Sequence, residues 1–174
     1  MELKHIRRPR PDCSDRRQRR GQPVRGNQLD GPRPKWLADA FQALLYPATN
    51  ASLDDPSIEE FADAPIRSKA GIIAFRRHYE RSPKDRKDPY FSPMRAESLA
   101  DLPPALVVTA NFDPLRDDGR NYAERLRAEG TPAEWINYPR AIHGMFSRPN
   151  HVEHAQEAYR LVIDQFQHHL GAAD

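Results

Sequence analysis

Residues 102–146 decide the fold of this 174-residue chain, and they read LPPALVVTANFDPLRDDGRNYAERLRAEGTPAEWINYPRAIHGMF. The apolar run over residues 105–109 predicts a buried strand, which leads into the Asp113-Pro114 step. A helix is predicted next, because a proline fits the first helical turn, and Gly130 marks the end of that helix.

The second half of this stretch predicts another strand and a loop that carries a histidine. The strand ends at Tyr138-Pro139, and the loop after it presents His143-Gly144. Strand–helix–strand units predict parallel strands joined by right-handed crossovers, so both strands end at the same edge of the sheet. Asp113 and His143 therefore belong at that edge, where α/β sheets gather their functional groups.

Each of these two residues also has a structural interpretation. Asp113 precedes a proline and is a natural N-cap of the predicted helix. His143 is equally well explained as a loop histidine packed beside aromatic residues. Asp117 and Asp118 follow closely and are expected to face along the helix. Position alone therefore does not decide whether Asp113 and His143 form a catalytic pair or have structural roles.

The DPLRD run (113–117) and the HGMF run (143–146) resemble the C-terminal part of the hormone-sensitive-lipase-like serine esterases, an α/β-hydrolase family of fold-3 type. This resemblance covers residues 41–170 and implies an α/β fold of about three parallel strands with flanking helices. It also implies a carboxylic-ester hydrolase that uses Asp113 as triad acid and His143 as triad base, without cofactor or metal. In such a triad the histidine takes the proton of a serine, and the acid holds the imidazole tautomer.

The nucleophile of the triad has no counterpart in the sequence. None of the eight serines lies in a Gly-x-Ser-x-Gly elbow, and no HGG-type loop is present to supply oxyanion donors. We therefore expect the chain to be inactive as written, since a base without a nucleophile has nothing to activate. A non-catalytic pseudo-hydrolase that pairs with an intact homologue is an alternative.

Residues 1–40 differ in composition from residues 41–174, which form the expected hydrolase domain. Residues 1–35 carry 11 Lys/Arg and 4 Asp/Glu, a net charge of +7, whereas the remainder has a net charge of −5. The segment is rich in Arg, Pro and Gly and has little apolar periodicity, which predicts a poorly ordered arm. A genuine basic arm favours a second function, nucleic-acid binding through phosphate contacts.

A frameshift gives this basic segment a different explanation. The FQALLYP run (41–47) resembles the family strand that follows the nucleophile helix, which puts the missing elbow close to residues 16–21. Those residues read RRQRRG, and codons exist for them that give Gly-Asp-Ser-Ala-Gly-Gly when read one base later. We hypothesise that residues 1–40 include a frameshifted translation, which makes nucleic acid an unexpected partner.

The coding DNA of the basic segment tests the frameshift hypothesis. We expect sequencing of both strands across codons 1–41 and upstream to show the Gly-Asp-Ser-Ala-Gly-Gly elbow in the shifted frame, after an HGG-type loop. If no frame encodes the elbow, the basic arm is genuine. The expected result is then nucleic-acid binding that weakens steeply with added salt.

Composition sets the remaining expectations. The single cysteine, Cys13, excludes an internal disulfide and favours a reducing cytoplasm, and no apolar run is long enough to cross a bilayer. His151 and His154, like the pair at 168–169, are expected on a solvated helix surface, so no metal site is predicted. The apolar strand 42–46 is expected to leave an open sheet edge that favours self-association.

Overall fold

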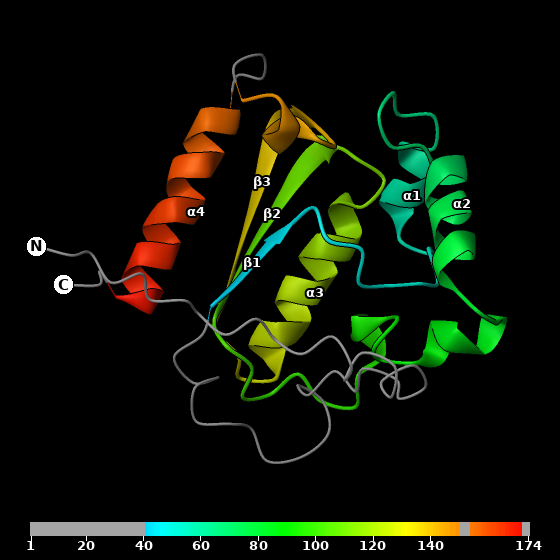
Figure 1. Cartoon of the computed structure of the whole chain (residues 1–174), viewed down its shortest axis with the longest axis horizontal. Helices are drawn as coiled ribbons and strands as arrows, with labels where there is room; N and C mark the ends of the chain where they lie inside the picture. The colour runs from blue at the N-terminus through cyan, green and yellow to red at the C-terminus, as the bar shows by residue number, and fades with distance from the viewer. Residues whose placement is uncertain (1–40, 150–153, 172–174) are drawn as a thin grey trace, which may run out of the picture.

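The computed structural model describes residues 41–149 and 154–171 (Figure 1). Three parallel strands form one sheet in the order β1-β2-β3, and they span Gln42–Leu45 (β1), Ala105–Phe112 (β2) and Ala133–Ile142 (β3). The predicted α/β architecture is thus confirmed. The predictions for residues 1–40 and for His151 lie outside the described residues.

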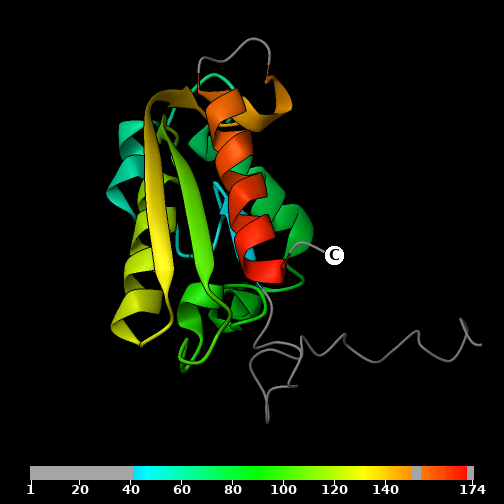
Figure 2. The same cartoon turned by 90° about the vertical axis from the view of Figure 1, so that its left-hand side faces the viewer.

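Helices cover both faces of this sheet (Figures 1 and 2). Helix α3 (Arg116–Ala128) joins β2 to β3 on one face, and α4 (Ala155–Leu170) lies on the other. The long connection from β1 to β2 contains helices α1 (Pro56–Glu60) and α2 (Lys69–Tyr79) and the 3₁₀ helices η3 (Pro83–Lys87) and η4 (Pro93–Arg95); a further 3₁₀ helix, η5 (Met145–Ser147), follows β3.

The central strand β2 is buried on both faces, as its apolar run predicts. Side chains alternate along a strand, so Leu106 and Val108 pack in one cluster with Ala158 of α4. On the other face, Ala105 packs with Tyr122 of α3 and with apolar residues of the preceding loop. The two clusters fix the sheet between its helices.

Several element boundaries differ from the predictions. Strand β2 extends beyond Thr109, and β3 continues through Pro139, because a proline is tolerated in an edge strand. Helix α3 begins two residues after Pro114.

The apolar spacing along α4 predicts a buried side made of Ala155, Tyr159, Val162, Phe166 and Leu170. Ala155 is fully buried, as is Ala158, whereas Tyr159, Phe166 and Leu170 are 38%, 37% and 57% exposed. The small alanines make the close contact with the sheet, and the larger side chains lie at the edge of this contact.

Gly119 allows α3 to lie directly against β2. A Cβ atom at this position would lie 2.5 Å from Cγ2 of Thr109, well inside the contact distance. Thr109 has little freedom to move, because its hydroxyl accepts a hydrogen bond from Trp135 Nε1 (2.9 Å) and donates one to Asn137 Oδ1 (3.1 Å). The short distance between α3 and the sheet therefore depends on residue 119 being a glycine, which has no side chain.

Replacing this glycine tests the close approach. We expect Gly119→Ala to lower the free energy of unfolding by about 1–3 kcal/mol through overpacking, although alanine alone favours a helix by roughly 1 kcal/mol over glycine. Urea unfolding measures the change. Thr109→Ser removes the obstructing methyl group and keeps the hydroxyl, so the same replacement is expected to cost little in that background. A Gly119→Ala variant more stable than the native chain would contradict the clash.

Candidate active site

Asp113 and His143 meet at the carboxyl edge of the sheet, each directly after a strand. Oδ2 of Asp113 lies 2.7 Å from Nδ1 of His143, with the carboxylate fully buried and the imidazole almost so. A carboxylate only accepts hydrogen bonds, so Nδ1 donates, and in the neutral imidazole Nε2 is then an acceptor. This is the tautomer that a general base needs. The structure brings the predicted pair together, and its catalytic role stays a prediction.

Asp113 also has the backbone contact that its structural interpretation predicts, through its other oxygen. Oδ1 accepts a hydrogen bond from the backbone N–H of Leu115 at 3.0 Å. Leu115, rather than Asp113, is the N-cap residue of α3, because the chain makes a turn before the helix begins. The turn fixes the carboxylate with one oxygen, and the second oxygen remains for the histidine.

The loop that carries His143 is held by its neighbours. Gly144 has φ of +84°, a left-handed conformation that favours glycine. Met145 and Phe146, which follow this glycine, are buried in the core on the α4 side. The ring of Tyr46 packs against the His143 imidazole, with centroids 4.4 Å apart.

Asp118 is buried rather than facing along the helix as predicted. Its Oδ2 accepts the backbone N–H groups of Thr49 and Asn50 at 2.9 and 3.1 Å, and its Oδ1 accepts the Thr49 hydroxyl. A buried carboxylate needs such donors to replace water. Asp118 therefore anchors the loop that leaves β1.

Asp117 performs the same task for the start of α1. It accepts the backbone N–H of Ser57 at 3.1 Å and a hydrogen bond from Arg116 Nε at 3.0 Å. Burial disfavours its charged form, but the hydrogen bond from Arg116 and the charges of Arg116 and Arg120 outweigh this effect, so the pKa lies below its ordinary value. The sequence prediction missed both structural aspartates because acidic residues on a helix are usually exposed.

The buried Asp118 makes stability depend on pH. Burial raises its pKa to about 6, against the opposing effect of its hydrogen bonds with Thr49 and Asn50. A folded-state pKa above the unfolded value stabilises the protein at low pH, and this contribution is lost as pH rises from about 4 to about 6.

The Asp118→Asn variant tests this linkage, because the amide does not titrate. We expect the free energy of unfolding of the native chain, relative to the variant, to fall by on the order of 2–3 kcal/mol between pH 4 and pH 7. Urea unfolding across this range measures the difference. Asp164→Asn, an exposed substitution with the same change in charge, is the control. A difference that does not vary with pH would show that Asp118 does not titrate in this window.

Arg67 contacts the other side of the imidazole. Its Nε and Nη2 atoms lie 3.3 and 3.2 Å from Nε2 of His143, and no serine hydroxyl of the described residues hydrogen-bonds there. Arg67 immediately precedes Ser68, which caps α2 by accepting the Gly71 N–H at 3.1 Å. No sequence pattern predicts the contact, because it joins residues 76 positions apart.

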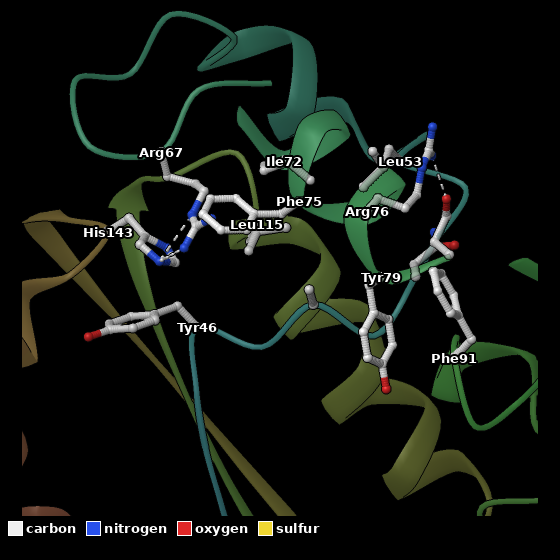
Figure 3. A pocket seen from close by; sticks show the side chains of 13 residues that line it. Tyr46, Leu53, Arg67, Ile72, Phe75, Arg76, Tyr79, Phe91, Leu115 and His143 are labelled. Carbon is white, nitrogen blue, oxygen red and sulfur yellow. Dashed lines mark hydrogen bonds between the residues drawn. The ribbon is translucent and has the colours of Figure 1, made fainter. Parts of the chain in front are cut away.

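A cavity of about 460 Å³ lies beside this contact, between α2, the loop after β1 and the start of α3 (Figure 3). Its size is within the range of small-molecule sites. The lining is largely apolar and aromatic, with two arginines; it comprises Tyr46, Ala48, Asn50, Ala51, Leu53, Arg67, Ile72, Phe75, Arg76, Tyr79, Phe91, Leu115 and His143. The apolar residues of α2 thus form a cavity wall, and two of them, Phe75 and Tyr79, are largely exposed.

Neither a metal-binding cluster nor a membrane-spanning helix is found in the part of the chain that the structure describes. No group of three or more His, Cys, Asp or Glu side chains is arranged to hold a metal ion there. None of the described helices has the length and apolar character needed to span a membrane.

Comparison with known proteins identifies the family. The family described as "alpha/beta hydrolase fold" matches residues 19–147 of the chain. This chain is a member of the α/β-hydrolase fold family. The resemblance of the DPLRD and HGMF runs to hormone-sensitive-lipase-like esterases is thereby confirmed, and the matched residues include both Asp113 and His143.

The relatives of this α/β hydrolase are esterases. It is 44% identical over 119 residues to "Esterase LipI" of Mycobacterium tuberculosis, covering 68% of this chain and 37% of LipI. It is 31% identical over 147 residues to "Ethyl acetate hydrolase" of Pseudomonas putida, covering 84% and 46% of the two chains. The chain therefore spans less than half the length of either relative.

Solved structures agree with this assignment. An ester hydrolase from the metagenome of Lake Arreo superposes with a TM-score of 0.71 at 39% identity, over 76% of this chain and 42% of the other. A thermostable esterase from Pseudomonas putida gives a TM-score of 0.72 at 37% identity, over 76% and 43%. The α/β-hydrolase fold is shared with both, and the match again covers less than half of each neighbour.

Proposed function

We propose that this chain supplies the acid and base of a carboxylesterase triad. The observation that supports the proposal most directly is the 2.7 Å contact between Asp113 and His143 at the ends of adjacent parallel strands. The family and its esterase relatives favour ester hydrolysis, and the name of one relative, an ethyl acetate hydrolase, favours a short acyl chain.

The proposed chemistry follows from the tautomer of the histidine. A serine placed at Nε2 attacks the ester carbonyl while His143 takes its proton, and His143 later returns that proton to the leaving alcohol. Asp113 stabilises the imidazolium through Nδ1. In the proposed triad the serine hydroxyl binds Nε2, which Arg67 contacts in this structure, so Arg67 has to leave Nε2 before His143 acts as a base.

The printed sequence contains no nucleophile elbow, so we propose that it does not hydrolyse esters by itself. The resemblance places the nucleophile strand beside β1, whose outer edge pairs with none of the described strands. The N–H of Gln42 donates to the Pro104 carbonyl, just before β2, at 2.9 Å, and the N–H of Tyr46 donates to the Val108 carbonyl of β2 at 2.7 Å. By alternation, Ala43 and Leu45 direct theirs to the open edge. This edge is the proposed site both of self-association and of docking for a nucleophile-bearing partner.

Complementation tests the proposed function. The part of the Pseudomonas putida ethyl acetate hydrolase that precedes the counterpart of β1 is supplied as a separate polypeptide, and hydrolysis of p-nitrophenyl acetate is measured. We expect the chain alone to be inactive and unlabelled by a fluorophosphonate, and the mixture to be active. His143→Ala is expected to reduce the mixture's activity by about a thousandfold or more, since triad members act as a unit. Asp113→Asn is expected to cost roughly a hundredfold or more.

Two matched controls make this experiment specific. His168→Ala removes an exposed histidine far along α4 and is expected to leave the activity unchanged. Ala43→Pro removes an N–H from the open edge and is expected to abolish both complementation and self-association in sedimentation, whereas Ala43→Val keeps both. Activity in the mixture that survives His143→Ala would refute the proposed role of the pair.

We also propose a domain boundary near residue 41 and the cytoplasmic location that the single Cys13 favours. A non-catalytic partner role is the alternative function. Self-association without complementation would favour that partner role.

A further inference from the structure

Arg67 is a cation without an anion in the described part of the chain. Its guanidinium lies over the ring of Phe75, 4.9 Å from the centroid, and its hydrogen bonds go to the His143 ring. No described carboxylate forms an ion pair with it. The other arginine of the cavity, Arg76, lies 3.9 Å from Glu80. Arg67 therefore brings the unneutralised charge into this mostly apolar cavity (Figure 3).

The contact with His143 satisfies the arginine poorly. Nε2 has a single lone pair when Nδ1 carries the proton, yet two N–H groups of Arg67 converge on it. Their distances of 3.2 and 3.3 Å are longer than those of charge-assisted hydrogen bonds. A carboxylate has two oxygens that match the guanidinium fork one to one. A carboxylate in the cavity is thus a better partner for Arg67 than the imidazole.

The rest of the cavity fits an apolar group attached to that carboxylate. Ile72, Leu115, Tyr79 and Phe91 line it beyond the arginine, and Phe75 stands next to the guanidinium. Aromatic walls suit a flat ring, and a volume of about 460 Å³ accommodates a ligand of some ten carbon atoms.

We propose that this cavity binds a small apolar carboxylate and that Arg67 is the residue that holds its charge. When the ligand binds, the guanidinium turns from Nε2 of His143 to the carboxylate, which leaves the base free for a serine. This inference rests on the proposed function, because ester hydrolysis releases a carboxylic acid, which is the class of ligand proposed for the cavity.

A matched pair of ligands tests the proposal without any turnover. 3-Phenylpropionate and its neutral amide, 3-phenylpropanamide, have the same shape and differ in charge. We expect the acid to bind the native chain about tenfold more tightly or better, as measured by NMR titration. The acid is also expected to shift the His143 ring nitrogen signals, and the amide is not. Equal affinity for the two ligands, or acid binding that leaves the His143 signals unmoved, would overturn the proposal.

Variants assign the effect to the arginine. Arg67→Gln is expected to remove the preference for the acid, and Arg67→Lys is expected to keep part of it, because the lysine retains the charge and loses the fork. Arg127→Gln removes an exposed arginine on α3 and is expected to behave like the native chain. A preference that persists in a folded Arg67→Gln variant would overturn the proposal. If that variant does not fold, Arg67→Lys decides, and a preference equal to that of the native chain counts against the bidentate contact.

The outcome is separable from that of the proposed function. Complementation without discrimination between acid and amide overturns this inference alone. Discrimination without complementation overturns the proposed hydrolase role alone.

Discussion

A carboxylate taken out of water has to recover its hydrogen bonds inside the protein, and this constraint acts three times within six residues of the chain. Asp113, Asp117 and Asp118 are each at most 2% exposed, and each binds a different element. Asp113 binds His143, Asp117 the start of α1, and Asp118 the loop after β1. One short segment thereby fixes the histidine and the cavity wall relative to the same strand end. A change at any of these carboxylates is therefore expected to disturb both the surroundings of His143 and the stability of the fold.

Two parts of the chain contribute residues to the candidate site. The strand ends carry Asp113 and His143, in the stretch that matches the family. The connection between β1 and β2 supplies Arg67 and most of the cavity wall. Substitutions in this connection can therefore alter the cavity while Asp113 and His143 stay in place. The His143 imidazole belongs to both parts, because Asp113 holds one nitrogen and Arg67 contacts the other.

The sequence predicts the elements that follow a clear pattern. The apolar run of β2 and the ordered DPLRD and HGMF runs led to three parallel strands and to the pairing of Asp113 with His143, as the structure has them. It could not predict Arg67 at the imidazole, since the residues before α2 have no periodicity and the contact spans 76 positions. The burial of Asp117 and Asp118 was equally hidden, because their partners lie in loops whose paths depend on the finished fold.

The two edges of the sheet differ in how they receive another strand. At β3 the ladder is irregular near Ala110 and Phe112, and Pro139 has no N–H at a position that alternation turns outward. At β1 the outward groups of Ala43 and Leu45 form a regular row. When two copies join through β1, the regular edge of each copy is paired with that of the other. Such an assembly closes on itself with two-fold symmetry, so its geometry stops growth at two copies and disfavours an open fibre.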